Sequence, residues 1–399
     1  MPIQPKLLLA YSGGLDTSYC AKYLSVDRGF EVHSVFVDTG GYTADELATI
    51  ERNAKGLGVA SHLVLRVEDE YYRDCVRYMI YGNMLKNGTY PLSVSSERMV
   101  QAISIAKHAK ANGYKYIAHG CTGAGNDQIR FDLVFRVLVP EIEVITPIRD
   151  LKLSRQQEID YLRAQGVERD WTKMAYSINK GLWGTSIGGR ETLTSSQGLP
   201  EEAYPTQVQR EGTEMLTLGF ERGELVEVNG ERLHPVAAIR RVEEIAAPYG
   251  VGRDIHVGDT IIGIKGRVAF EAAAPMVIIK GHHALEKHVL TKWQLHWKEQ
   301  LANWYGMFLH EGQYLEPVMR DMERFLESTQ GHVTGKVFVK LRPYAFMVEG
   351  IESANDLMNP TFAEYGESNK RWTSDDAKGF TTVLSTPLSL YYHTHKGEK

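Results

Sequence analysis

Apolar and polar positions follow two different periods along the first 170 residues. Short runs of apolar and β-branched side chains predict buried parallel strands at residues 7–10, 31–37, 62–67, 116–118 and 143–146. Between them, apolar positions three or four residues apart predict helices at residues 17–24, 43–57, 69–85, 96–111 and 154–166. This alternation predicts an α/β fold, in which a parallel sheet carries helices on both faces.

Capping signals mark several boundaries of these elements. Thr43 with Glu46, and Ser154 with Gln157, are capping boxes that open two of the helices, and Gly113 ends another. Ligands of such sheets bind beyond the carboxyl ends of the strands. We therefore expect the functional site at that edge, where the segments after the first, second and fourth strands meet.

The pattern changes after about Trp171. Residues 176–197 are rich in Ser, Gly and Thr, and turn signals separate strand-like stretches within residues 214–228. Further on, the sequence predicts helices at residues 235–246, 283–305 and 318–328, a strand at 259–265, and a hairpin of 332–341 with 345–349. The tail from about Ser353 is polar and mixed. We therefore expect a second unit of α+β type, followed by a tail.

Composition and charge exclude several classes of protein. The 399 residues fit two or three domains of roughly 150 residues each. A net charge of −5 leaves no electrostatic footprint for nucleic acid. No apolar run approaches the ~20 residues that cross a bilayer, and the chain opens on a strand rather than a targeting leader. Cys20, Cys75 and Cys121 lie far apart and are odd in number, which predicts a reducing compartment such as the cytoplasm and no disulfide framework. From the charge and the lack of long apolar runs, we expect no nucleic-acid or membrane partner.

Residues 7–18, LLLAYSGGLDTS, are the first candidate for chemistry. Gly13 and Gly14 let the backbone turn sharply after the strand and approach a ligand. Asp16 and the two hydroxyl residues behind it open a helix, whose exposed N–H groups and dipole favour an anion such as phosphate. The spacing excludes both the GxxxxGK[ST] loop and the GxGxxG dinucleotide loop.

Residues 120–131, GCTGAGNDQIRF, are the second candidate and follow the fourth strand. Thr122, Asn126, Asp127 and Arg130 offer a hydroxyl, an amide, a carboxylate and a guanidinium within one short turn. That combination can hold a zwitterionic amino acid, because carboxylates suit its ammonium and donors suit its carboxylate. Taken alone, the segment favours a capped helix start with Arg130 in a surface ion pair. Its place at the same sheet edge as the first segment favours a site.

The two segments together resemble the signatures of the argininosuccinate synthase family, AYSGGLDTS and GxTxxGNDxxRF. The first is similar to the pyrophosphatase loop of enzymes that split ATP between its α and β phosphates. The resemblance extends over residues 6–166, 175–193 and 228–253, and more weakly over 372–380. It implies a nucleotide-binding domain of HUP or PP-loop type (1–170), an α+β synthetase and multimerisation domain (171–352), a C-terminal oligomerisation tail (353–399), and a homotetramer.

The resemblance also implies an activity and a set of site residues. The family joins citrulline and aspartate through a citrullyl-AMP intermediate and releases AMP and pyrophosphate. ATP would be held by Ala10, Tyr11, Ser12, Gly13, Gly14, Leu15, Asp16, Thr17, Ser18, Val37 and Gly120. Mg²⁺ would be bound through the phosphates, without metal ligands from side chains. Aspartate would bind at Thr122, Asn126 and Asp127, and citrulline at Tyr90, Ser95, Asn126, Arg130, Ser177 and Ser186. Catalytic roles would fall to Ser12, Asp16, Asn126 and Arg130.

Several positions depart from the family pattern, mostly on the citrulline side. Gly258 stands where the family has Glu, and Phe270 where it has Tyr; Asn179 and Gly181 replace the usual Asp and Asn. A lost carboxylate would leave an α-ammonium unpaired, so an N-acylated citrulline is an alternative acceptor. Asp259, one residue along, is a candidate replacement carboxylate. In the second segment, Ala124 replaces a Lys and removes one cation near the phosphates or the aspartate.

Two other classes of function compete with this interpretation. One is another ligase with an ATP-pyrophosphatase loop, either tRNA-modifying or glutamine-dependent. The first would carry basic patches and paired cysteines, and the second a glutaminase part, for which no room exists before Ala10. The other is a non-catalytic nucleotide sensor, which need not keep Asp16, Asn126, Asp127 and Arg130. Pyrophosphate release that requires both amino acids separates an enzyme from a sensor.

Overall fold

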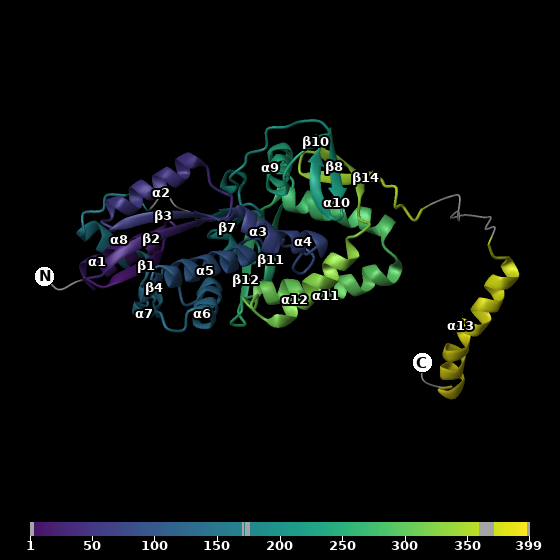
Figure 1. Cartoon of the computed structure of the whole chain (residues 1–399). Helices are drawn as coiled ribbons and strands as arrows, with labels where there is room; N and C mark the ends of the chain where they lie inside the picture. Colours follow the sequence, from purple (N-terminus) through teal and green to yellow (C-terminus); the bar gives the residue numbers. More distant parts are fainter. Residues whose placement is uncertain (1–3, 170, 172–175, 359–370, 397–399) are drawn as a thin grey trace.

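A five-stranded parallel sheet organises the N-terminal part of the chain (Figure 1). The computed structural model describes residues 4–169, 171, 176–358 and 371–396. The strands lie in the order β3-β2-β1-β4-β5, with bounds Lys6–Ala10 (β1), Glu31–Asp38 (β2), Ser61–Arg66 (β3), Tyr116–His119 (β4) and Glu143–Ile145 (β5). All five predicted strands and the α/β class are confirmed.

Helices cover both faces of this sheet because the residues of β1 alternate between two cores. Leu7 and Leu9 pack with residues of α1, α2 and α8, whereas Leu8 packs with residues of α5 and α6. The helices are α1 (Leu15–Val26), α2 (Ala44–Gly56), α5 (Ser93–Ala111), α6 (Asp127–Leu138), α7 (Pro147–Leu151) and α8 (Arg155–Ala164). Both predicted capping boxes are present, at Thr43 and Ser154. The sequence pattern does not predict the helices α6 and α7, and α5 begins three residues before its predicted start.

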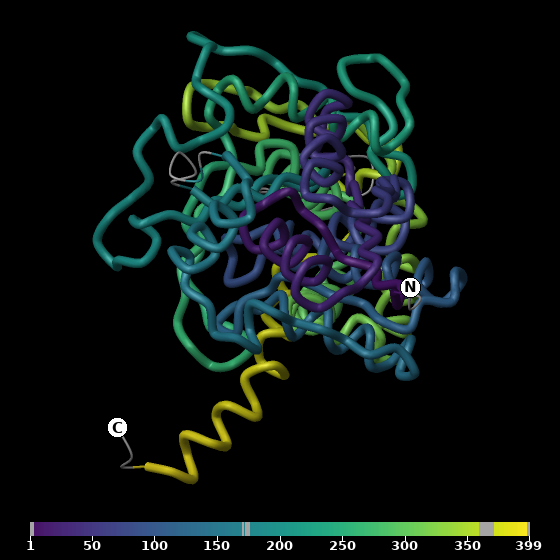
Figure 2. Tube along the Cα trace, turned by 90° about the vertical axis from the view of Figure 1, so that its left-hand side faces the viewer, coloured from purple at the N-terminus to yellow at the C-terminus, as the bar shows by residue number. Residues whose placement is uncertain are grey.

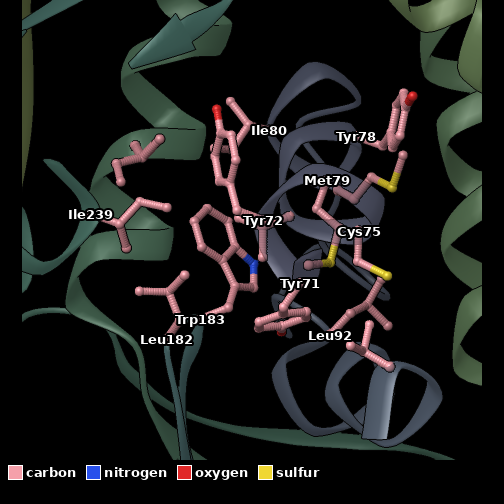
Figure 3. Close-up of a cluster of buried hydrophobic side chains, with 14 of the residues drawn as sticks. Tyr71, Tyr72, Cys75, Tyr78, Met79, Ile80, Leu92, Leu182, Trp183 and Ile239 are labelled. Carbon is pink, nitrogen blue, oxygen red and sulfur yellow. The ribbon is translucent and has the colours of Figure 1, made fainter. Parts of the chain in front are cut away.

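The predicted helix over residues 69–85 is shorter and interrupted. It consists of α3 (Glu68–Tyr71), the π-helical turn η1 (Tyr72–Val76) and α4 (Arg77–Tyr81). The chain then turns at Asn83, which has a φ of 49°. Aromatic side chains of this segment pack with Leu182, Trp183 and Ile239, which belong to the second half of the chain (Figure 3). This packing joins the two halves in one hydrophobic core.

The second half contains two antiparallel sheets, in the orders β10-β9-β8-β13-β14 and β11-β12-β7-β6. Their strands are β6 (Ser177–Gly181), β7 (Gly184–Gly188), β8 (Glu214–Glu221), β9 (Glu224–Val228), β10 (Glu231–Arg232), β11 (Arg253–Asp259), β12 (Lys265–Glu271), β13 (Gly335–Arg342) and β14 (Ala345–Glu352). The predicted strands within residues 214–228 and the hairpin over 332–349 are confirmed. The Ser-, Gly- and Thr-rich stretch holds β6 and β7, which line the cavity described below.

Two predictions in this half are wrong. The single helix over residues 283–305 is two helices, because Thr291 forms a capping box with Gln294 and starts a new one. The strand over residues 259–265 is a turn between β11 and β12, where Gly263 has a φ of 84°. The helices of this half are α9 (Pro235–Ala246), α10 (Ala273–Val289), α11 (Lys292–His310) and α12 (Pro317–Thr329), with short 3-10 turns η2 (Glu191–Leu193), η3 (Glu201–Ala203) and η4 (Ala247–Tyr249).

The last helix, α13 (Ser374–Thr394), reaches away from the body of the molecule (Figures 1 and 2). It begins with a capping box at Thr373, and none of its residues is buried. Among the described residues, no helix combines the length and the apolar character needed to span a membrane. The polar tail expected from the sequence therefore contains a helix that buries none of its residues against the described part of this chain.

Candidate active site

The loop after β1 turns sharply and leads directly into α1. Gly13 has a φ of 79°, which favours glycine, and Gly14 is the N-cap of the helix. No described side chain caps this helix end, so the N–H groups of its first turn are left for an anion. Ser18 Oγ donates to the Gly14 carbonyl at 2.7 Å, and Arg169 Nη1 donates to the Gly13 carbonyl at 3.0 Å. The loop is thereby held in a form suited to phosphate.

The second glycine segment lies directly against this loop. A Cβ added at Gly120 would lie 3.2 Å from the carbonyl carbon of Asp16 and 3.2 Å from the backbone nitrogen of Thr17. Glycine therefore lets the end of β4 approach the start of α1 closely. The two segments line one cavity of about 700 Å³ at the carboxyl edge of the parallel sheet.

This cavity brings together nearly all of the residues that the sequence predicts for the site. Gly13 and Ser18 are the exceptions: Gly13 faces Ile50, and the Ser18 hydroxyl is used inside the loop. The predicted residues that line the cavity are Ala10, Tyr11, Ser12, Gly14, Leu15, Asp16, Thr17, Val37, Tyr90, Ser95, Gly120, Thr122, Asn126, Asp127, Arg130, Ser177 and Ser186. Residues more than 160 positions apart thus share one site.

Asp127, the first residue of α6, accepts hydrogen bonds from two guanidinium groups. Arg98 Nε lies 2.8 Å from Oδ2, and Arg130 Nη1 lies 2.9 Å from Oδ1. Burial alone would raise the pKa of Asp127, but the charges of Arg98 and Arg130 outweigh it and hold that pKa below its ordinary value. Arg98 also donates to Asn179 Oδ1 at 2.7 Å. The carboxylate therefore stays ionised and orients two cationic side chains along the cavity.

Arg130 is a buried residue rather than the partner in a surface ion pair, since it is 3% exposed. Its Nη2 donates to Ser95 Oγ at 3.1 Å and to the carbonyl of His310 at 2.7 Å. Ser95 Oγ also lies 2.9 Å from His310 Nδ1. Burial and the neighbouring Arg130 charge lower the pKa of His310 to about 3, so this imidazole is neutral. The arginine joins α5, α6 and α11 at the cavity wall.

Hydroxyl groups from α5, from β7 and from the loop before α5 form a second part of the wall. Tyr90 Oη lies 3.1 Å from Ser93 Oγ and 3.3 Å from Ser186 Oγ. The Tyr90 ring stacks on the His256 imidazole with centroids 5.4 Å apart, and packs against Phe270 at 5.5 Å. These contacts hold Tyr90 rigidly with its hydroxyl beside the two serines.

Asp16 is the other carboxylate that lines the cavity among the described residues. Burial raises the pKa of Asp16, and burial together with the Asp16 charge raises the pKa of Glu158 on α8. Among the described residues, no group of three or more His, Cys, Asp or Glu side chains could hold a metal ion by itself. Asp16 can contribute one oxygen to a cation that arrives with phosphate oxygens.

Sequence reasoning missed several residues of the cavity because they come from distant segments. They are Tyr42, Arg98, Arg155, Lys180, His256 and His310. A signal exists for Arg98, which lies one helical turn after Ser95 on α5. Arg155 and Lys180 line the cavity, where Lys180 pairs with Glu46 at 2.6 Å, and Arg169 donates to the Gly13 carbonyl of the phosphate loop.

Two predicted side chains have partners that the sequence did not indicate. Asp259 does not line the cavity; it lies at the exposed end of β11 and pairs with Lys265 at 2.7 Å. The expectation that it replaces a carboxylate in the site is therefore wrong. Asn126 lines the cavity, but its Oδ1 accepts a hydrogen bond from the Ile261 N–H at 2.8 Å. The β11–β12 turn is thereby fastened to the start of α6.

Comparisons with known proteins agree with this geometry. Residues 6–168 match the profile described as "Arginosuccinate synthase N-terminal HUP domain", and residues 176–391 match "Arginosuccinate synthase C-terminal domain". The argininosuccinate synthase of Dictyoglomus thermophilum is 37% identical over 389 residues, 97% of each chain. That of Methanocaldococcus jannaschii is 38% identical over 363 residues, 90% of this chain and 91% of its own. That of Pyrococcus furiosus is 35% identical over 396 residues, 98% of this chain and 95% of its own. The chain belongs to the argininosuccinate synthase family.

Proposed function

We propose that this protein is an ATP-dependent carbon–nitrogen ligase that joins a citrulline-type ureido acid to aspartate. Membership of the family, and the names of relatives that match along nearly the whole chain, support this activity. The product is an argininosuccinate-type compound, and the by-products are AMP and pyrophosphate. The reaction belongs to arginine biosynthesis.

The chemistry proceeds in two displacements. The ureido oxygen attacks the α-phosphorus of ATP, an O–P bond forms, and pyrophosphate leaves. The aspartate amine then attacks the activated ureido carbon; the C–O bond to AMP breaks and the amine gives up a proton. Since the protein contributes mainly alignment and charge stabilisation, both acceptors must lie beside the α-phosphorus, and alignment alone contributes roughly 7–11 kcal/mol.

The nucleotide belongs at the first glycine loop. Its phosphates would meet the uncapped N–H groups of α1 and the hydroxyls of Ser12 and Thr17, which lie 3.3 Å apart. Val37 and Gly120 line the same part of the cavity and would contact the nucleoside. Mg²⁺, when bound, would neutralise phosphate charge and would be held through the phosphate oxygens.

The two amino acids belong beside the second segment. Thr122, Asn126 and Asp127 would bind aspartate, with Arg98 as a further cation for its carboxylates. Arg98 is held by Asp127 at 2.8 Å, which supports this added role. Citrulline would bind at Asn126 and Arg130, and at a set of hydroxyls, Tyr90, Ser95, Ser177 and Ser186.

One observation carries the proposal: Gly120 lies against Asp16 and Thr17, so the phosphate loop and the amino-acid residues open into one cavity. The test is pyrophosphate release from ATP with citrulline or a citrulline derivative, with and without aspartate. We expect AMP and product to form only when ATP, the ureido acid and aspartate are all present. Pyrophosphate release that ignores both amino acids would contradict the proposal.

We propose the division of the chain that the sequence indicates. Residues 1–170 would bind the nucleotide, residues 171–352 would complete the acceptor site and assemble the oligomer, and residues 353–399 would clasp another subunit. All three cysteines are free thiols, which supports a reducing compartment such as the cytoplasm.

A homotetramer is also proposed, and two unburied apolar surfaces support it. Trp293, Trp297 and Trp304 on α11 are 65%, 60% and 52% exposed. On α13, Phe380 and Leu384 are 67% and 60% exposed. Contiguous exposed apolar surface of this kind is typical of interfaces. Sedimentation of the full chain should give four subunits, and Trp297→Arg should lower that mass; a monomeric wild-type protein would contradict the proposal.

A further inference from the structure

One wall of the cavity consists of Tyr90, Ser95, Arg130, Ser186, His256 and His310, and is called the acceptor wall below. Its members contact one another in two groups: Arg130 bonds Ser95 and His310, and Tyr90 contacts Ser186 and His256. Under the proposed function, on which this inference rests, four of these residues meet the ureido acid. The wall therefore decides which substituent that acid can carry.

No described carboxylate on this wall is available for a positively charged substrate group. Among the described residues, Asp16 and Asp127 are the acids that line the cavity, and Asp127 is engaged by two guanidinium groups at 2.8 and 2.9 Å. Asp254 and Asp259 on β11 do not line the cavity, and Asp259 pairs with Lys265. A substrate ammonium at the acceptor wall would thus be buried without a counter-charge.

The titratable groups of the wall give it a positive rather than a negative character. Arg130 is charged and buried. Burial has the largest effect on His310 and lowers its pKa, and the nearby charges of Arg130 and Lys86 lower it further. Burial and the Lys86 charge likewise lower the pKa of His256, and they outweigh the charge of Asp254, which acts in the opposite direction. Both imidazoles are therefore neutral in surroundings that resist a further positive charge.

His256 is free to meet a ligand. It lines the cavity, it is 5% exposed, and the hydrogen bonds of the described residues include none to its ring nitrogens. A Cβ added at Gly258 would lie 2.6 Å from His256 Nε2, so the imidazole occupies the space that a side chain at position 258 would need. A neutral imidazole offers one donor and one acceptor, and an amide offers the complementary pair.

We propose that the acceptor is a citrulline whose α-nitrogen is acylated, with the amide of the acyl group against His256. Acylation removes the ammonium, which the wall cannot neutralise, and supplies the polar group that His256 lacks. The ureido end, which reacts, is unchanged, so the chemistry at the α-phosphorus stays the same.

The test compares pyrophosphate release with ATP, aspartate and one of three acceptors: citrulline, Nα-acetylcitrulline or Nα-succinylcitrulline. We expect kcat/KM for an acylated acceptor to exceed that for citrulline by at least about tenfold. Equal or higher kcat/KM for citrulline would overturn the inference and leave the proposed function intact. Absence of release with all three acceptors would overturn the proposed function, and the inference with it.

Two double variants locate the preference at the wall. In the first double variant, His256→Ala makes room and Gly258→Glu places a carboxylate at the cavity. In the second, the control, His256→Ala is combined with Val257→Glu, which adds the same charge on the other face of β11, where Val257 is 53% exposed. The ratio of kcat/KM for acylated over free acceptor should fall at least about tenfold in the first relative to the second. Equal ratios in two folded variants would overturn the inference. If the first variant does not fold, the acceptor comparison on the wild-type enzyme decides by itself.

Discussion

Glu97 is a buried acid without a hydrogen-bond partner among the described residues, and we predict how its replacement changes the pH dependence of stability. It lies on α5 beside Arg98 and has no exposed surface, and neither carboxylate oxygen has a hydrogen-bond partner among the described residues. Its side chain occupies the space next to Gly181, where an added Cβ would overlap Oε1. Burial raises the pKa of Glu97 to about 8, against the lowering effect of Arg98. The perturbation is Glu97→Gln, which keeps the shape and removes the titration.

The size of the effect follows from linkage. Because the pKa of Glu97 is higher in the folded chain, its contribution to stability is complete below its ordinary pKa of 4.5 and is lost as pH rises through about 8. At about 1.4 kcal/mol per pH unit, the whole rise corresponds to roughly 5 kcal/mol, of which about 2 kcal/mol falls between pH 6 and pH 8. Glutamine does not titrate, so the variant lacks this loss.

The assay is urea unfolding of wild type and variant, followed by tryptophan fluorescence at pH 6, 7, 8 and 9. The free energy of unfolding of Glu97→Gln minus that of wild type should rise by about 2 kcal/mol from pH 6 to pH 8. Subtraction at each pH removes the contributions of other buried acids such as Glu243, whose pKa burial raises to about 7. Glu141→Gln, at an exposed position, is the matched control. A difference that stays constant within about 0.5 kcal/mol over this range would refute the reasoning.

Two further substitutions test the geometry of the site. Gly120→Val should push the loop and α1 away from β4 and lower kcat/KM for ATP by about 100-fold, because a displacement near 1 Å suffices for such a loss. In the control Gly123→Ala, the added Cβ would meet its nearest neighbour at 3.6 Å, and kcat/KM should stay within about threefold of the wild-type value. Equal effects of the two substitutions would contradict the close approach of Gly120 to α1. Arg130→Met should destabilise the protein by about 1–3 kcal/mol in thermal or urea unfolding, since it leaves the His310 carbonyl without its donor and Asp127 with Arg98 alone. Arg190→Met, at a residue whose side chain is 89% exposed, should leave stability unchanged; an unaltered stability of Arg130→Met would show that the buried network contributes nothing.

The elements with a strong local signal could be predicted from the sequence. The strands of the parallel sheet are short apolar runs, and the two capping boxes at Thr43 and Ser154 have the predicted bonds. Where a local pattern is ambiguous, tertiary context decided. Ile261, Ile262 and Ile264 imitate the alternation of a strand, but Gly263 turns the chain. Thr291 divides one apolar periodicity into two helices.

The candidate site was predictable only as far as its residues lie in two signature segments. The phosphate loop and the turn at residues 120–131 are contiguous in sequence, so their chemistry can be interpreted before folding. Arg98, His256 and His310 come from three separate elements and carry no motif, and they reach the cavity only through packing. Asp259 shows the converse case, since nearness in sequence to position 258 did not bring its side chain into the cavity.

The amino-acid sequence by itself determined the class of fold, the phosphate loop and the family, because each depends on spacing along a short stretch of chain. Only the tertiary structure decided the electrostatics of the acceptor wall. Charge at a buried site is a sum over groups that many elements contribute, and the sum changes sign with a few ångströms of displacement. Two examples are His256, which lies beside Gly258 and is neutral, and Asp127, which two arginines engage; both depend on groups from several elements.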